Sequence, residues 1–252
     1  MLLRGLLHIL SGLWTIYLRF PQLAPSHQEA RIQAWAQRLL EIWGIRLQVR
    51  GSPPHGGPVL LVANHISWLD ILVMHAARHC RFVSKSDIQH WPLIGTLATA
   101  AGTLYIERAS RRDAMRVVHH MADALRAEEV VAVFPEGTTS DGVQLLPFHA
   151  NLLQAAISAD APVVPVALQF VDQRSGQTSL APCYIGDDTL IGSLWRTLTT
   201  PGITAVVIYG VPQQAGGRNR RAWAQDLREP IDSLRAGDAK PAAQNFKNNS
   251  KL

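Results

Sequence analysis

Short apolar runs alternate with longer amphipathic segments along most of this chain. The runs PVLLVA (58–63), EVVAVF (129–134), APVVPVALQFV (161–171) and ITAVVIYG (203–210) have the length and β-branched content of buried strands. The segments between them, among them 112–129, carry apolar residues at helical spacing. This alternation predicts an α/β fold: a mainly parallel sheet flanked by helices.

The rest of the chain extends the same pattern. Several shorter apolar stretches are flanked by turn-forming residues. Pro147 is at a position where proline favours the start of a helix. We therefore expect further strands over 45–51, 81–85, 103–108 and 181–186, helices over 67–79, 147–160, 188–198 and 219–235, and a helical or irregular stretch over 87–102 that Pro92 interrupts.

The amino-terminal segment, MLLRGLLHILSGLWTIYLRF, is amphipathic rather than uniformly apolar. Its uncharged run from Gly5 to Leu18 would be about 21 Å long as a helix. This run is too short to span a membrane, because a span needs roughly 20 apolar residues. We interpret it as a helix lying in the bilayer interface, with an ordinary core helix as the alternative. Its polar residues fall on one helical face: Arg4, His8, Ser11, Thr15 and Arg19.

A second helical segment, 27–44, repeats the combination of arginine and tryptophan. Residues 1–44 are therefore predicted to form a membrane-docking helical pair, and residues 45–235 a single α/β domain. The remaining segment, 236–252, lacks apolar periodicity and is predicted to be disordered.

Charge and cysteine content exclude several classes of protein. The net charge is +5, but the amino-terminal arginines alternate with leucines and tryptophans, a pattern that fits an anionic lipid surface and not nucleic acid. Cys80 and Cys183 are too few for a disulfide framework, which fits a reducing compartment. Histidines on amphipathic helices are more often packed or solvated than ligands, so we expect no metal site at the two histidine clusters, His75–His79–Cys80 and His119–His120.

The stretch VANHISWLD leads from an apolar strand to a histidine and an aspartate. On a continuous helix His65 and Asp70 would lie about 140° apart, so they can meet only if His65 is in the turn before the helix. Ser67 and Asp70 match a capping box, which would put Ser67 at the N-cap and let Asp70 point back at the imidazole. Asp70 would then orient His65 as a general base; the alternative is a simple helix cap beside a loop histidine.

A second strand, in VVAVFPEGTTSDG, also ends in a polar turn, which contains Glu136. Ligands of open α/β sheets bind beyond the carboxyl ends of the strands. We therefore expect this turn and the His65 turn to form two sides of one active site, with backbone N–H groups near Gly137 or Asn64 as candidate oxyanion donors.

Several motifs together resemble the glycerophospholipid acyltransferase family, specifically its bacterial lysophosphatidic acid acyltransferases. They are NHxxxxD (64–70), GTLYIER (102–108), FPEGTTS (134–140) and APVVPVAL (161–168), in that order, and they cover roughly residues 55–170. The resemblance implies a 1-acylglycerol-3-phosphate O-acyltransferase that moves a fatty acyl group from an acyl thioester, acyl-CoA or acyl-carrier protein, to the sn-2 hydroxyl of lysophosphatidic acid, giving phosphatidic acid. No cofactor is implied, and the expected location is the cytoplasmic face of a bacterial inner membrane.

The resemblance also implies roles for individual residues. His65 is the expected base and Asp70 its orienting partner, because an alcohol is a poor nucleophile until a base removes its proton. Arg108 matches the family's phosphate-contacting arginine, and Lys85 is a further candidate phosphate donor. The block that positions the acceptor corresponds here to Glu136, Gly137 and Thr138, with Glu136 expected to hold Arg108 or to accept hydrogen bonds from glycerol and backbone.

One departure from the family pattern affects the acceptor. Thr139 stands where many members have arginine, and FPEGTTS is also similar to the lyso-ornithine lipid O-acyltransferases, whose acceptor has no phosphate. A hydrolase with an acyl-serine intermediate is disfavoured, because no G-x-S-x-G occurs. The non-enzymatic alternative is a peripheral protein that only binds lysolipid; the presence of both His65 and Asp70 argues against it.

Overall fold

The computed structural model describes residues 1–106 and 111–237 of the chain. Within them, a seven-stranded sheet has the order β1-β7-β6-β2-β5-β3-β4. Strands β6, β2, β5, β3 and β4 run parallel to one another, whereas β7 is antiparallel to β6 and parallel to β1. The strands are β1 Arg46–Arg50, β2 Val59–Ala63, β3 Arg81–Lys85, β4 Leu104–Ile106, β5 Val130–Val133, β6 Val163–Asp172 and β7 Ile203–Tyr209.

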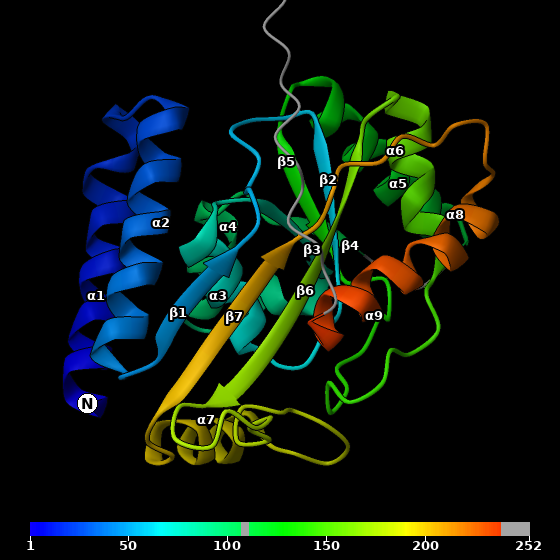
Figure 1. Ribbon diagram of the computed structural model, residues 1–252. Helices are drawn as coiled ribbons and strands as arrows, with labels where there is room; N and C mark the ends of the chain where they lie inside the picture. The colour runs from blue at the N-terminus through cyan, green and yellow to red at the C-terminus, as the bar shows by residue number, and fades with distance from the viewer. Residues whose placement is uncertain (107–110, 238–252) are drawn as a thin grey trace, which may run out of the picture.

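Helices cover both faces of this sheet, as Figure 1 shows. Residues of β2 alternate between the two cores: Leu61 and Ala63 belong to one hydrophobic cluster, and Leu60 and Val62 to the other. Helices α2 (Pro25–Ile42), α3 (Leu69–Ala77) and α7 (Leu190–Thr199) pack on the first side. On the second side lie α5 (Arg111–Arg126), α6 (Leu153–Ala159), α8 (Arg220–Asp226) and α9 (Arg228–Ala236). The predicted mainly parallel sheet flanked by helices is confirmed.

The amino-terminal helices α1 (Leu2–Leu18) and α2 lie side by side and are joined by a short 3-10 turn, η1 (Phe20–Gln22). Gly5 and Gly12 of α1 are buried against Trp43 and Trp35, and the His8 ring stacks on Trp35 at 5.3 Å. Most leucines of α1 are exposed: Leu2, Leu3, Leu6, Leu7, Leu10 and Leu18. Among the described helices, none combines the length and the apolar character that crossing a membrane requires.

Some predicted elements were wrong. The segment 181–186 forms turns and no strand, because Pro182 lacks an N–H for a sheet ladder and Arg196 takes the carbonyl oxygens of Ala181 and Cys183. The helix expected over 147–160 starts later, as the 3-10 turn η3 (Ala150–Leu152) followed by α6, because the His149 N–H donates to the Pro135 carbonyl.

The predicted helix over 219–235 is two helices, α8 and α9, separated at Leu227. Pro230 accounts for the break, since its ring has no N–H and clashes with the carbonyl of the preceding turn. Ala236, assigned to the disordered tail, is the last residue of α9; positions 238–252 of that predicted tail lie outside the described residues. The expected irregular stretch 87–102 contains the 3-10 turn η2 (Ser86–His90) and α4 (Ile94–Ala100).

Candidate active site

The sheet topology brings the two polar turns together. Strands β2 and β5 are parallel neighbours, with Val62 opposite Val133. The turn after β2, residues 64–68, and the turn after β5, residues 134–140, therefore leave the same edge of the sheet side by side. The expectation that they form two sides of one site agrees with this placement.

His65 and Asp70 meet in the geometry that the five-residue spacing allows. His65 Nδ1 lies 2.8 Å from Asp70 Oδ2, and the same oxygen accepts hydrogen bonds from the N–H groups of Ile66 at 2.6 Å and Ser67 at 2.9 Å. The Asp70 side chain is fully buried, while that of His65 is 18% exposed. A fixed, buried carboxylate therefore holds one ring nitrogen, and the imidazole remains partly accessible.

The cap of α3 differs by one residue from the prediction. Trp68, and not Ser67, is the N-cap residue, and α3 begins at Leu69. The Ser67 hydroxyl accepts a hydrogen bond from the Leu69 N–H at 3.2 Å, and Asp70 bonds back to the Ser67 N–H. The reciprocal pattern of a capping box is thus present in shifted form, and Asp70 serves both as cap and as partner of the imidazole.

Glu136, in the turn after β5, is bonded to the backbone of the turn after β2 and to that of its own loop further along the chain. Its Oε1 accepts from the His65 N–H at 2.8 Å and its Oε2 from the Leu146 N–H at 2.9 Å. Burial raises the pKa of this carboxyl, and the two backbone hydrogen bonds oppose the shift. The prediction that Glu136 accepts bonds from nearby backbone is confirmed; its other expected partner, Arg108, lies outside the described residues.

Phe134 covers one face of the His65 ring. The two rings are parallel, with centroids 4.0 Å apart and an interplanar angle of 7°. Phe82 of β3 stacks in turn on Phe134 at 5.6 Å. The imidazole is therefore held by a carboxylate at one edge and by an aromatic ring on one face, a role for Phe134 that the sequence pattern alone did not identify.

Gly137 has a conformation that favours glycine. Its φ is +71°, and a Cβ at this position would lie 2.8 Å from Cδ2 of His149. Its N–H donates to the Phe134 carbonyl at 3.1 Å, and the N–H groups of His65 and Ile66 are bonded to carboxylates. These backbone donors, suggested for an oxyanion, are thus already engaged within the turns.

The side chains of two further polar residues, for which no role was predicted, hold the turn after β2 in place. The side-chain amide of Asn64 exchanges hydrogen bonds with the backbone of Leu168 in β6, at 2.7 and 3.1 Å. The N–H and hydroxyl of Ser140 both donate to the His65 carbonyl. Asn64 could have been found from its place in NHxxxxD; Ser140 had no comparable signal.

The remaining predicted site residues are more exposed. Lys85 ends β3, the neighbour of β5, so it lies at the same edge of the sheet, and its side chain is exposed. Thr138 is exposed in the turn after β5. The Thr139 hydroxyl donates to the Tyr184 carbonyl. Strand β4 ends at Ile106, which places Arg108 just beyond the described part of this strand.

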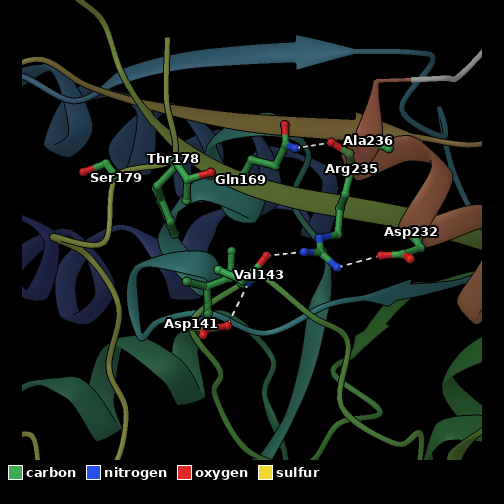
Figure 2. Close-up of a pocket in the computed structure, with 11 residues that line it drawn as sticks. Asp141, Val143, Gln169, Thr178, Ser179, Asp232, Arg235 and Ala236 are labelled. Atoms are coloured by element: carbon green, nitrogen blue, oxygen red, sulfur yellow. Dashed lines mark hydrogen bonds and ion pairs between the residues drawn. The ribbon is translucent and has the colours of Figure 1, made fainter. Parts of the chain in front are cut away.

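A cavity of about 280 Å³ lies beside these turns (Figure 2). Ile66, the Asp141–Val143 loop, Gln169 and Arg235 are among the residues that line it. Arg235 of α9 donates to the Gly142 carbonyl and, at 2.9 Å, to Asp232. Neither His65 nor Asp70 is among its lining residues, so the cavity borders the turn after β2 without including the histidine–aspartate pair.

His75 of α3 and His79, two residues beyond the end of that helix, are both buried. His75 and His79 stack at 5.1 Å, and their Nδ1 atoms are 3.2 Å apart. Burial lowers the pKa of His75 to about 3 and that of His79 to about 4, so both are neutral near pH 7. Among the described residues, no group of three or more His, Cys, Asp or Glu side chains is arranged to hold a metal ion.

Comparisons with known proteins agree with this architecture. An acyltransferase family model matches residues 45–169. The chain is 36% identical over 217 residues to the 1-acyl-sn-glycerol-3-phosphate acyltransferase of Neisseria gonorrhoeae, covering 85% of this chain and 84% of the relative. It is 34% identical over 207 residues to the lyso-ornithine lipid O-acyltransferase of Pseudomonas aeruginosa, covering 82% and 79%.

The crystal structure of the 1-acyl-sn-glycerophosphate acyltransferase from Thermotoga maritima has the same fold. It superimposes with a TM-score of 0.62 at 18% identity and covers 94% of this chain and 99% of that one. The similarity to the Neisseria protein extends over most of both sequences. The chain therefore belongs to the acyltransferase family that includes the 1-acyl-sn-glycerol-3-phosphate acyltransferases and the lyso-ornithine lipid O-acyltransferases.

Proposed function

We propose that this protein is a 1-acylglycerol-3-phosphate O-acyltransferase that transfers a fatty acyl group from an acyl thioester to the sn-2 hydroxyl of lysophosphatidic acid. The observation that carries the proposal is the contact of His65 with the buried Asp70 at the carboxyl edge of the sheet. Relatives with this activity match most of the chain.

The reaction follows from the chemistry of this pair. His65 removes the proton of the acceptor hydroxyl as its oxygen attacks the thioester carbonyl. Asp70 stabilises the imidazolium that forms, and Phe134 adds a favourable contact with that cation through its ring face. The tetrahedral intermediate then expels the thiolate, which takes the proton back from His65. The thiolate is a good leaving group, so no serine nucleophile is needed.

The acceptor phosphate requires cations at the same edge of the sheet. Lys85 at the end of β3 supplies one, and Arg108, which follows β4, supplies a guanidinium suited to bidentate contact. Glu136 and Gly137 shape the turn after β5, the neighbour of β3, and Thr138 is exposed in that turn, where it can contact the acceptor. In this proposal the donor is acyl-CoA or acyl-carrier protein.

The proposal places the enzyme at a membrane through its amino-terminal pair. The outward face of α1 exposes large apolar residues, including Leu3, Leu7 and Trp14, a surface that fits the apolar side of a bilayer interface. Because the acceptor is itself a lipid, docking brings the active-site edge to its substrate. The location that follows is the cytoplasmic face of a bacterial inner membrane.

A direct test measures thiol release from palmitoyl-CoA on addition of lysophosphatidic acid. Removing the base in His65→Ala is expected to lower the rate by at least about 10³-fold. A His65→Ala enzyme that is as active as the wild type would contradict the assigned base. Circular dichroism of both proteins controls for folding.

Lyso-ornithine lipid O-acyltransferase is the second candidate function. Several relatives carry that name, with 34% identity over most of the chain in one case and 44% over 115 residues in another. Thr139 brings no positive charge to the acceptor side of the site, and its hydroxyl is bonded to Tyr184. The same thiol-release assay with lyso-ornithine lipid separates the two: a higher kcat/KM with lysophosphatidic acid supports the first function, and the reverse order supports the second.

A further inference from the structure

Helix α7 is apolar on its outer side as well as on its inner side. Leu194 and Leu198 pack on the core and Ser193 and Thr197 are fully buried. On the outer side Ile191 is 80% exposed and Trp195 60% exposed. The buried hydroxyls are satisfied: Ser193 Oγ accepts from Trp68 Nε1 at 3.1 Å, and Thr197 Oγ1 donates to the Ser193 carbonyl at 2.7 Å. The helix is thus anchored by both apolar packing and polar contacts, and it still presents large apolar side chains outward.

The loop before α7 adds to this apolar surface. Leu180 and Ile185 are both exposed, and Arg196 connects the loop to the helix by donating to the Ala181 carbonyl and pairing with Asp188 at 2.9 Å. We call the exposed side chains of Leu180, Ile185, Ile191 and Trp195 the α7 surface.

The α7 surface lies at the edge of the sheet that carries the active site. Strand β7 follows α7 and is antiparallel to β6, with Ile203 opposite Asp172, so α7 stands beyond the carboxyl end of β6 (Figure 1). Trp68, within the segment that links His65 to Asp70, contacts Ser193 of α7 directly. The apolar surface is therefore attached to the catalytic turn itself.

Helix α1 likewise turns large apolar side chains outward, with its glycines buried and most of its leucines exposed. The two helices are connected through aromatic side chains: Trp43, which packs on Gly5 of α1, meets Trp68 edge-on at 6.0 Å. A helix with large apolar side chains grouped on its outer side suits an apolar environment, because a contiguous exposed apolar patch is unfavourable in water.

We propose that the α7 surface is a second membrane contact, separate from α1, that holds the active-site edge against a phospholipid bilayer. The inference rests on the proposed function, in which the acceptor is a membrane lipid. An acidic carrier protein fits this surface less well. Between Ile185 and Trp195 the exposed charge is the negative one of Asp187, which would repel an acidic partner, while Asp188 and Arg196 pair with each other.

The first test compares two double variants of the full chain: Ile191→Ser with Trp195→Ser, and, as control, Met115→Ser with Val211→Ser. Met115 and Val211 are similarly exposed, at 63% and 61%, but lie on α5 and beyond the far end of β7. Co-flotation with phosphatidylethanolamine–phosphatidylglycerol vesicles measures binding. The α7 variant is expected to lose roughly tenfold in partition coefficient and the control to lose little. Equal binding of the α7 variant and the wild type overturns the proposal.

Thiol release in vesicle-free buffer, with a short-chain lysophosphatidic acid below its micellar concentration, separates docking from catalysis. The α7 variant is expected to match the wild type there and to be slower only on vesicles. If the wild type releases no thiol either with vesicles or without them, the proposed function is contradicted. The co-flotation result still tests separately whether the α7 surface binds the bilayer.

A second variant tests the same contact if the double variant Ile191→Ser with Trp195→Ser does not fold. Ile191→Cys is labelled with an environment-sensitive fluorophore, with Val211→Cys as control; the native Cys80 and Cys183 are buried. Vesicles are expected to shift the emission to the blue at 191 and not at 211. The proposal is overturned if vesicles do not shift the emission at 191. It is also overturned if the emission shifts only when acyl-carrier protein is added, or if dimerisation of the protein without lipid shields the fluorophore.

Discussion

A buried carboxylate follows each of the strands β2 and β5, Asp70 in the first turn of α3 and Glu136 in the turn after β5, but the two carboxylates are bonded differently. All three hydrogen bonds of Asp70 converge on Oδ2, one of them from the His65 ring. Glu136 divides its bonds between both oxygens, and both donors are backbone N–H groups. The first arrangement controls an imidazole and the second connects two loops. The comparison teaches that a buried acid at an active-site edge can serve chemistry or architecture, and that its partners distinguish the two.

Asp70→Asn tests the chemical side of this comparison. An asparagine can place its carbonyl oxygen at the Oδ2 position and keep the backbone bonds, but it removes the negative charge beside the imidazolium. We expect kcat to fall by roughly a hundredfold or more, with the free energy of unfolding changed by less than about 1 kcal/mol. Steady-state kinetics and urea denaturation measure the two effects. A variant that unfolds easily but turns over normally would reverse the assignment.

Glu136→Gln tests the architectural side. One oxygen becomes an NH₂ group that must face a backbone N–H, so a buried donor loses its acceptor. We expect the free energy of unfolding to fall by about 2 kcal/mol and kcat to fall by a smaller factor than in Asp70→Asn. Urea denaturation gives the first value. If Glu136→Gln is as stable as the wild type, its bonds to the backbone do not hold the two turns together.

The buried His75–His79 pair separates pH effects on stability from those on catalysis. Both have pKa values lowered from 6.5, to about 3 and about 4. Below pH 6.5 the unfolded chain therefore binds more protons than the folded chain, so the free energy of unfolding falls as the pH falls. At pH 5 each histidine contributes a loss of about 2 kcal/mol. In His75→Phe we expect roughly half of the pH dependence between 6.5 and 5 to disappear. Denaturation midpoints across this range check it, and an unchanged slope would contradict the cause given.

Phe134→Leu probes the smallest effect, the aromatic cover of His65. Loss of the ring removes a stacking and cation–π contact of about 1 kcal/mol, so we expect kcat to fall by roughly fivefold with little change in KM for the acceptor. Phe134→Tyr retains the ring and serves as the matched control, with a rate near that of the wild type. Equal losses in both variants would show that packing, and not the ring face, is what matters.

Local patterns were sufficient for much of the fold. The apolar runs at 58–63 and 161–171 became β2 and β6, and the spacing of His65 and Asp70 correctly required a turn before the helix. These features depend on near neighbours in the chain, where side-chain periodicity and reach are readable. The errors at 147–160 and 181–186 arose where a distant partner, the Pro135 carbonyl or Arg196, determined the backbone course.

The amino-acid sequence by itself determined most of the element order, the spacing of the histidine–aspartate pair and the resemblance to the family. Only the tertiary structure decided that β2 lies beside β5, that Glu136 bonds to the backbone of a residue 71 positions away, and that α7 turns Ile191 and Trp195 outward. The reason is physical: strand neighbours and exposed faces follow from which surfaces pack together across the whole chain, and the periodicity of a single segment does not contain that information.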